Sequence, residues 1–233
     1  MLPTPNTDHI DPNTIYSPAE DSYLVLDTLT ADAPFLRSRF PPTAPTPLIL
    51  ELGTGSGIIT AFISSNPLAL FDREDLHLLG TDANVLACAA TEMTLSLTPK
   101  PEHFLGALVA DLASPLRRNL VDVLVFNPPY VPTSDVPSLI GEEGTTRFDE
   151  ESRLLALTYA GGADGMEVTR RVLDGLGEVL SERGVAYILL CRSNKPDEVT
   201  ARLRGEGWMC EKAGGSGKKG GIERLEVWRI WRR

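Results

Sequence analysis

The stretch Pro47-Leu-Ile-Leu-Glu-Leu-Gly-Thr-Gly-Ser-Gly57 decides the fold. Its apolar first half predicts a short buried strand, and its three glycines lead into Ile58-Ile-Thr-Ala-Phe-Ile63, which is typical of a helix. Glycine allows a ligand to approach the backbone closely and permits positive φ, and the following helix presents its N-terminal amides. A strand, a glycine loop and a helix in this order predict an α/β domain with a ligand at the carboxyl end of the strand.

This loop differs from two common nucleotide-binding loops. The dinucleotide pattern G-x-G-x-x-G has its third glycine three residues after the second, whereas Gly57 comes two residues after Gly55. The phosphate-binding P-loop requires Gly-Lys-Ser/Thr, which does not follow these glycines. Glu51, just before the first glycine, suits a positively charged ligand better than a pyrophosphate. S-adenosylmethionine, with its sulfonium and ammonium groups, is such a ligand.

Two further acidic residues follow predicted strands. Leu76 to Thr81 reads as a strand that ends in Asp82, which could bind both ribose hydroxyls. Ala107 to Ala110 ends in Asp111-Leu112, placed to bind an adenine amino group and to cover its ring. Each acid alone could be a helix N-cap or a turn residue. Acids after successive strands favour one shared ligand site, since ligands of open α/β sheets bind at the strands' carboxyl ends.

Asn127-Pro128-Pro129-Tyr130 follows the next apolar run, Val121 to Phe126. An amide or adenine amino nitrogen is a poor nucleophile, so an enzyme that methylates it must hold both N–H groups and leave one face of the nitrogen open. The Asn127 carboxamide oxygen and the Pro128 carbonyl could do this, while the two prolines fix the loop. Tyr130 could pack against the planar target group. An ordinary turn is the alternative for this tetrapeptide alone.

Together these motifs resemble the class I S-adenosylmethionine-dependent methyltransferases that modify amide or amino nitrogens. Within them, the chain is similar to the HemK-type glutamine methyltransferases of translation release factors, in their short eukaryotic and archaeal form. Tyr16-Ser-Pro-Ala-Glu-Asp-Ser-Tyr23 resembles the family's segment over the cofactor, and Tyr159-Ala-Gly-Gly-Ala-Asp-Gly165 resembles its glycine turn after the substrate loop. The resemblance implies a Rossmann-like, mostly parallel seven-stranded sheet with helices on both faces and a C-terminal antiparallel hairpin.

The resemblance also implies an activity and a set of site residues. The activity is methyl transfer from S-adenosylmethionine to the glutamine side-chain nitrogen in the Gly-Gly-Gln motif of a class-1 release factor. The catalytic residues would be Asn127, Pro128, Pro129 and Tyr130. No metal is implied. The cofactor-binding residues would be Tyr16, Ser22, Glu51, Gly53, Gly55, Asp82, Ala83, Asp111, Leu112 and Asn127.

Three other functions are weighed against this one. DNA adenine methyltransferases share the tetrapeptide, but the formal net charge of −10 argues against direct binding to phosphates. One relative implies lysine methylation on a histone tail, for which the amine must first lose its proton. The third alternative is a noncatalytic module that binds the cofactor. Such a module would not need the two hydrogen-bond acceptors of Asn127 and Pro128 beside the methyl group.

The composition predicts one soluble domain at residues 15–233, preceded by a flexible tail at residues 1–14 that lacks apolar periodicity. No apolar run approaches the ~20 residues of a membrane span, and no secretory signal is visible. The cysteines at 88, 191 and 210 have no metal-binding or disulfide pattern, which predicts a reducing, cytoplasmic or nuclear location.

Two surfaces are candidates for partner proteins. The predicted helix Asn84 to Leu97 has a single charged side chain, Glu92, which predicts an exposed apolar face together with Leu76 to Leu79. With the resemblance, this implies a heterodimer with the small zinc-binding activator subunit of several eukaryotic methyltransferases; a core helix is the alternative. The other surface lies between Pro132 and Gly162, where acidic residues predict a docking wall for a basic peptide: Glu142, Glu143, Asp149, Glu150 and Glu151.

The rest of the chain completes the sheet. Glu167 to Arg183 is predicted as a helix stopped by Gly184, followed by a buried strand at Val185 to Leu190. A further helix is predicted at Pro196 to Arg204. Trp208 to Lys212 and Leu225 to Trp231 predict the terminal hairpin, with a mobile tip that includes Gly214 to Gly221.

Overall fold

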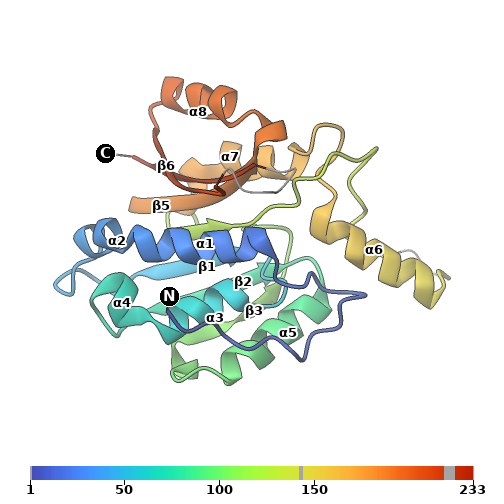
Figure 1. The fold of residues 1–233 in the computed structure, drawn as a ribbon, viewed down its shortest axis with the longest axis horizontal. Coiled ribbons are helices and arrows are strands. Elements are labelled where there is room, and N and C mark those ends of the chain that lie inside the picture. The colour runs from blue at the N-terminus through green and yellow to red at the C-terminus, as the bar shows by residue number, and fades with distance from the viewer. Residues whose placement is uncertain (1, 142–143, 218–223, 233) are drawn as a thin grey trace.

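The computed structural model describes residues 2–141, 144–217 and 224–232, and it folds them around one seven-stranded sheet (Figure 1). The strand order is β3-β2-β1-β4-β5-β7-β6; the pairs from β3 to β5 are parallel, and β7 is antiparallel to β5 and β6. This mixed sheet with its C-terminal hairpin confirms the predicted architecture. The strands are β1 Leu48–Leu52, β2 His77–Asp82, β3 Phe104–Val109, β4 Val121–Phe126, β5 Leu180–Cys191, β6 Met209–Gly215 and β7 Leu225–Trp231.

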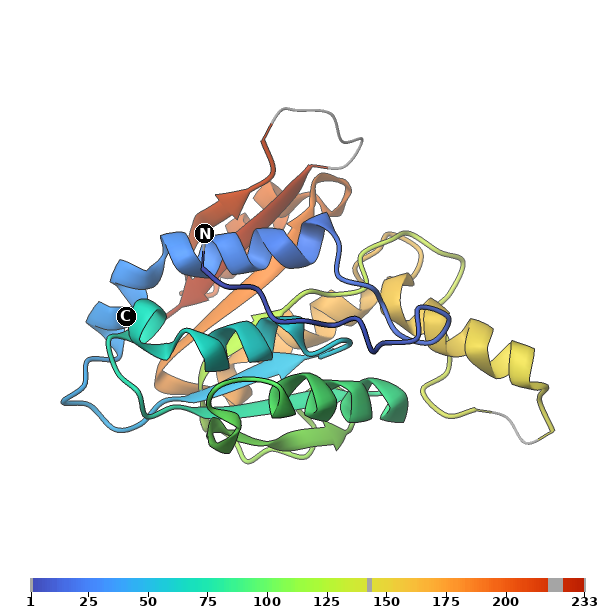
Figure 2. The same ribbon diagram turned by 60° about the horizontal axis from the view of Figure 1, so that its bottom comes forward.

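Helices cover both faces of the sheet (Figures 1 and 2). Helices α1 to α4 share one apolar core with the sheet, and α7 and α8 share the other. Helix α5 packs beside α3 and against β2 and β3, whereas α6 projects from the body of the domain. The helices are α1 Glu20–Ala31, α2 Ala33–Arg39, α3 Ile58–Ser65, α4 Pro67–Phe71, α5 Val85–Ser96, α6 Arg147–Tyr159, α7 Glu167–Val179 and α8 Pro196–Gly205, with short 3-10 turns at Pro101–His103 and Arg192–Asn194.

The central strands are buried on both faces, which explains their uninterrupted apolar sequences. All six residues of β4 are buried, and the side chains of its last four alternate between the two cores: Val123 and Val125 join one, Leu124 and Phe126 the other. In the parallel register Leu52 lies opposite both Thr81 and Phe126. The carboxyl ends of β1, β2 and β4 therefore lie side by side at the same end of the sheet.

The predicted helix from Glu167 to Arg183 is wrong at its C-terminal end. Helix α7 ends at Val179, and β5 already begins at Leu180, which pairs with Val121. Asp122 draws the next residues to the sheet, because its carboxylate accepts hydrogen bonds from the Ser181 hydroxyl and the Arg183 guanidinium. These tertiary contacts override the helical pattern of the sequence.

Residues 2–14, predicted as a flexible tail, run along the domain in this structure (Figure 2). The His9 ring nitrogen Nε2 lies 3.2 Å from the Ala90 carbonyl oxygen, and the Asn84 side chain donates a 2.8 Å hydrogen bond to the Thr14 carbonyl. These contacts place the segment against α5 and against Asn84, the residue just before that helix. Its flexibility stays a prediction.

None of the helices in the described ranges combines the length and apolar character needed to cross a membrane. Across the same residues, no group of three or more His, Cys, Asp or Glu side chains is arranged to hold a metal ion.

Candidate active site

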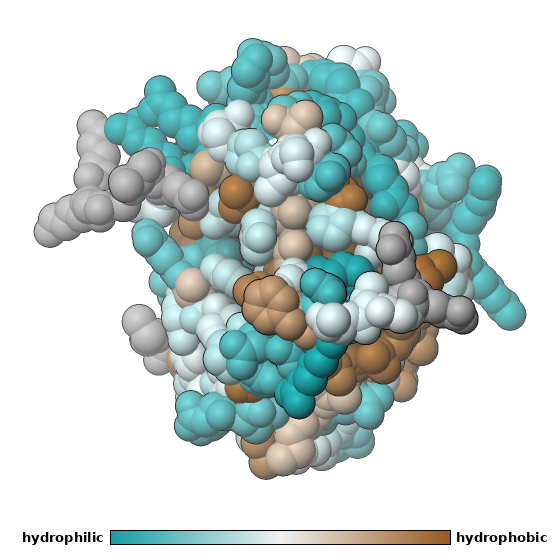
Figure 3. Space-filling model, turned by 90° about the vertical axis from the view of Figure 1, so that its right-hand side faces the viewer, coloured by the Kyte–Doolittle hydropathy of each residue, from teal (hydrophilic) through white to brown (hydrophobic). Residues whose placement is uncertain are grey.

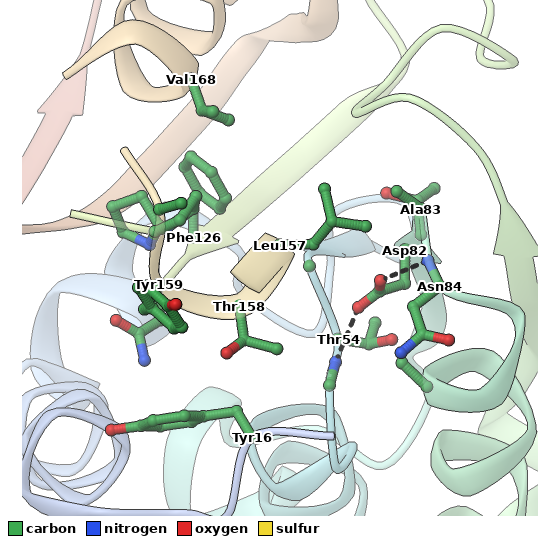
Figure 4. Close-up of a pocket in the computed structure, with 18 of the residues that line it drawn as sticks. Tyr16, Thr54, Asp82, Ala83, Asn84, Phe126, Leu157, Thr158, Tyr159 and Val168 are labelled. Carbon is green, nitrogen blue, oxygen red and sulfur yellow. Dashed lines mark hydrogen bonds between the residues drawn. The ribbon is translucent and has the colours of Figure 1, made fainter. Parts of the chain in front are cut away.

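A cavity of about 490 Å³ opens at the carboxyl ends of β1, β2 and β4 (Figure 4). This is within the usual range for small-molecule sites. Apolar side chains from α3, α6 and α7 complete its wall. Every residue predicted from the sequence for cofactor binding or catalysis lines this one cavity: Tyr16, Ser22, Glu51, Gly53, Gly55, Asp82, Ala83, Asp111, Leu112, Asn127, Pro128, Pro129 and Tyr130.

The glycine loop curves around one end of the cavity. Gly55 has φ +51°, a left-handed conformation that glycine adopts without strain, and its N–H donates a 3.0 Å hydrogen bond to the Asp82 carboxylate. Gly57 is required for another reason, because a Cβ there would lie 2.8 Å from the Thr91 Cα. Helix α5 therefore approaches the loop closely enough to exclude any side chain at position 57.

Glu51 is a buried carboxyl group in the cavity wall. Its Oε2 accepts hydrogen bonds from the backbone N–H and the hydroxyl of Thr60. The pKa of Glu51 is raised to about 8, mainly by burial; the hydrogen bonds from Thr60 oppose the increase, and nearby Asp82 adds a smaller part of it. A positively charged ligand would favour the ionised form of this group.

Asp82 lies at the end of β2 with its carboxylate facing the loop (Figure 4). One oxygen accepts from Gly55 N–H, and the other accepts from Asn84 N–H at 2.8 Å. Burial raises the pKa of Asp82, and these backbone hydrogen bonds oppose the increase. Each oxygen has further lone pairs, so the carboxylate can accept hydrogen bonds from a ligand's hydroxyl groups.

Asp111 is held by a residue that the sequence did not reveal. Its carboxylate lies 2.5 Å from the Arg171 guanidinium, which reaches the cavity from α7. Leu112 follows with φ +52°, a backbone conformation uncommon for leucine. The helical pattern predicts an Arg171 side chain on α7, but nothing in the pattern indicates which loop it meets.

Asn127 has its two amide ends in different surroundings. Its Nδ2 donates a 3.1 Å hydrogen bond to the carboxylate of Asp21, at the start of α1. Its Oδ1 is buried and has no hydrogen-bond partner. An unsatisfied buried acceptor costs free energy, and in a cavity wall it marks a place where a donor from a ligand is expected. Asp21 also lines the cavity, but it was not among the site residues predicted from the sequence.

The backbone of the Asn127 loop is held from behind by the predicted glycine turn. A Cβ at Gly161 would lie 2.6 Å from the Pro129 carbonyl oxygen, and one at Gly165 would overlap the Tyr130 carbonyl oxygen. The side chain of Asn194 donates to the same Tyr130 oxygen at 3.4 Å. These contacts fix the position of the loop.

Helix α6 forms one wall of the cavity through Leu154, Leu157, Thr158 and Tyr159. Its acidic residues, predicted as a docking wall, are engaged in local interactions: Asp149 in the capping box with Thr146, Glu150 with Arg153, and Glu151 with Arg147. Glu142 and Glu143 lie outside the described residues. Two of the described acids are therefore paired with arginines of their own helix, and Asp149 caps its N-terminus.

An apolar surface lies on α5 and β3, and we call it the α5/β3 surface. It comprises exposed side chains of the helix, of its C-cap residue Leu97 and of the edge strand: Val85, Leu86, Met93, Leu97, Leu105, Leu108 and Val109. Figure 3 shows apolar surface in the lower part of the face it displays. The prediction that Leu76 to Leu79 contributes is wrong for its apolar residues: Leu76, Leu78 and Leu79 are buried, because β3 rather than β2 forms the edge.

No protein-family model matches this chain. Among curated proteins, the eRF1 methyltransferase catalytic subunit mtq2 of Schizosaccharomyces pombe is 32% identical over 243 residues, covering 100% of this chain and 96% of that protein. Methyltransferase HEMK2 of Mus musculus is 33% identical over 226 residues, covering 91% of this chain and 92% of that protein.

Among solved structures, the chain is similar to one from the E. cuniculi Mtq2-Trm112 complex, described as responsible for methylation of the eRF1 translation termination factor. The TM-score is 0.61 at 26% sequence identity, covering 94% of this chain and 99% of that chain. The likeness therefore extends over nearly the whole domain and is not limited to the site motifs.

Proposed function

This chain belongs to the family that contains the eRF1 methyltransferase catalytic subunit and methyltransferase HEMK2, and we propose that it methylates a class-1 translation release factor. The methyl group would pass from S-adenosylmethionine to the side-chain amide nitrogen of the glutamine in the Gly-Gly-Gln motif. The names of the relatives support this activity rather than a histone-lysine methyltransferase or a noncatalytic binding module.

The observation that carries the proposal is the unpartnered Oδ1 of Asn127, a residue that lines the cavity. A primary amide carries two N–H groups, and this oxygen would accept one of them. The Pro128 carbonyl, from the same loop, would accept the other. Held in this way, the amide nitrogen keeps one face open toward the centre of the cavity. Orientation of this kind lowers a barrier without a strong base.

The residues present fit S-adenosylmethionine. The buried carboxyl group of Glu51 and the half-buried one of Asp82 are available for a cationic group and for ribose hydroxyls, and Asp111 and Leu112 would bind the adenine. When bound, this cofactor supplies an electrophilic methyl group on its sulfonium sulfur. The substrate nitrogen gains that carbon and loses one N–H proton. We assign the proton to water, since His9, His77 and His103 do not line the cavity.

We further propose that a small Trm112-like, zinc-binding subunit covers the α5/β3 surface. The similar E. cuniculi protein was solved as a complex with Trm112. In this chain β3 is the edge strand of the sheet and carries exposed Leu105, Leu108 and Val109. An apolar edge strand is a natural site for pairing with another protein.

The test is transfer of a labelled methyl group to a release factor with an intact Gly-Gly-Gln motif, by the chain alone and with a Trm112-like subunit. We expect label on the wild-type release factor and none on its Gln-to-Ala form. A histone tail serves as the competing substrate. Label on histone lysine, with none on the release factor, would replace the proposed activity by the lysine one; label on neither, despite measured cofactor binding, would contradict both.

A further inference from the structure

We propose that Asp21 is a positioning residue for the transfer reaction: its carboxylate holds the Asn127 amide group so that Oδ1, and not Nδ2, faces the substrate. This inference rests on the proposed function for its substrate. The orientation of the Asn127 side chain can be measured without any substrate.

Asp21 is well placed for this role. It lies in the first turn of α1, only 4% of its surface is exposed, and its two oxygens have separate tasks. Oδ2 accepts the 3.1 Å hydrogen bond from Asn127 Nδ2. Oδ1 accepts from the Ser22 N–H at 2.6 Å and from the Tyr16 hydroxyl at 3.1 Å. The contacts on Oδ1 fix the carboxylate, and the fixed carboxylate orients Asn127.

The chemistry of the two ends of an amide makes this arrangement selective. Asn127 could be turned by 180° with little change in shape, which would place an NH₂ donor where the substrate's own N–H groups must bind. A carboxylate has no hydrogen to donate, so it accepts only from the Nδ2 end. The substrate side is thereby left with an acceptor, which suits an amide or amine nitrogen and disfavours a carbonyl oxygen.

The substitution Asp21→Asn gives a sharp test because it preserves the shape of the side chain. Ser22 N–H and the Tyr16 hydroxyl require an acceptor, so the oxygen of the new amide would stay on their side. Its NH₂ would then face Asn127, whose Oδ1 would turn toward residue 21 to accept a hydrogen bond. The Nδ2 donor of Asn127 would then face the substrate. We expect kcat to fall by about 100-fold, comparable to loss of an oriented polar group in an active site. Affinity for S-adenosylmethionine should stay within about threefold of wild type.

Asp21→Ala separates positioning from a structural role. With no side chain to impose either orientation, Asn127 can still present Oδ1 part of the time, so a loss of about tenfold is expected. A merely structural role predicts the reverse order, since the isosteric Asn should be tolerated better than Ala. In the double variant Asp21→Asn with Asn127→Ala, kcat should lie within about threefold of Asn127→Ala alone, because Asp21 acts through Asn127. The control is Asp27→Asn, an exposed position on the same helix, which should retain wild-type kcat.

A second readout is independent of the substrate. The Asn127 side-chain NH₂ signals, assigned by their loss in Asn127→Ala, should exchange slowly with water in the wild-type protein and at least tenfold faster in Asp21→Asn. A wild-type chain that transfers no methyl group would refute the proposed function, while this exchange measurement would still decide the orientation. Unchanged exchange in Asp21→Asn, an Ala variant slower than the Asn variant, or multiplying losses in the double variant would each overturn the inference.

Discussion

Thr60 binds the Glu51 carboxyl group twice, through its backbone N–H at 2.9 Å and through its hydroxyl. Glu51 lies in β1 and Thr60 lies in α3, after the glycine loop, so the pair closes that loop around a buried acid. The cost of ionising Glu51 in this place has a measurable effect on stability.

Glu51 should make the ligand-free protein less stable as pH rises from about 4.5 to about 8. Its pKa is raised by burial from 4.5 to about 8, so the folded chain binds more protons than the unfolded chain within this window. The free energy of unfolding therefore falls with increasing pH. Urea unfolding at pH 6 and pH 8 should show a smaller decrease in Glu51→Gln than in wild type. Equal decreases in both proteins would refute the assigned pKa.

Asn127→Ala should reduce methyl transfer at least 100-fold and leave cofactor affinity nearly unchanged. The carboxamide oxygen orients the nucleophile, and this effect is realised mainly in the transition state. Single-turnover transfer and calorimetric titration with the cofactor check the two parts. A rate within about tenfold of wild type, or ~1.4 kcal/mol in the barrier, would contradict the role of Asn127.

Asp82→Ala should give the opposite result. Ligand hydroxyls left unpaired in a buried site cost roughly 1 to 3 kcal/mol for each group, so cofactor affinity should fall by more than tenfold. The substitution also removes the acceptor for Gly55 N–H, which would loosen the glycine loop. Calorimetry measures the affinity. An unchanged dissociation constant would exclude Asp82 from the cofactor site.

Gly165→Ala should lower kcat at least tenfold by moving the catalytic loop. A Cβ at this position would overlap the Tyr130 carbonyl, and φ of +72° is itself unfavourable for alanine. The matched control is Gly175→Ala in α7, where the new Cβ would meet no heavy atom within 4 Å apart from its chain neighbours and the helix's own backbone; it should stabilise the helix by roughly 0.5 to 1 kcal/mol. Rates are compared with thermal unfolding of both variants, and a fully active Gly165→Ala would show that the turn does not fix the loop.

Leu86→Glu and Met93→Lys should each prevent binding of a Trm112-like subunit without unfolding the chain. Both side chains are exposed on α5, so a charge there is solvated in the isolated chain and buried unpaired in a heterodimer. Co-purification measures binding, and circular dichroism of each variant measures folding. A folded variant that still binds the subunit would place the partner elsewhere.

The residues predicted for the site lie together in one cavity because parallel strands bring their carboxyl ends together. Residues at or just after the carboxyl ends of β1, β2, β3 and β4 must lie at the same end of the sheet, whatever the details of helix packing. Tyr16 and Ser22 were predicted only through the family resemblance, and Asp21 and Arg171 were missed because their contacts with Asn127 and Asp111 depend on how α1 and α7 pack. The early end of α7 was missed for a similar reason: Asp122, distant in sequence, holds Ser181 and Arg183.

The Asn127 loop is held from both directions along the chain. Asp21, 106 residues earlier, binds the Asn127 side chain, and Asn194, 64 residues after Tyr130, binds the Tyr130 carbonyl. Such long-range contacts slow folding, because forming them closes long loops of the intervening chain at a cost in entropy. During synthesis Asp21 leaves the ribosome before Asn127, so the site stays incomplete until the chain has emerged through Asn194. Fraying of α1, which carries Asp21, or of the 3-10 turn that carries Asn194 should therefore abolish catalysis on gentle heating before the sheet itself melts.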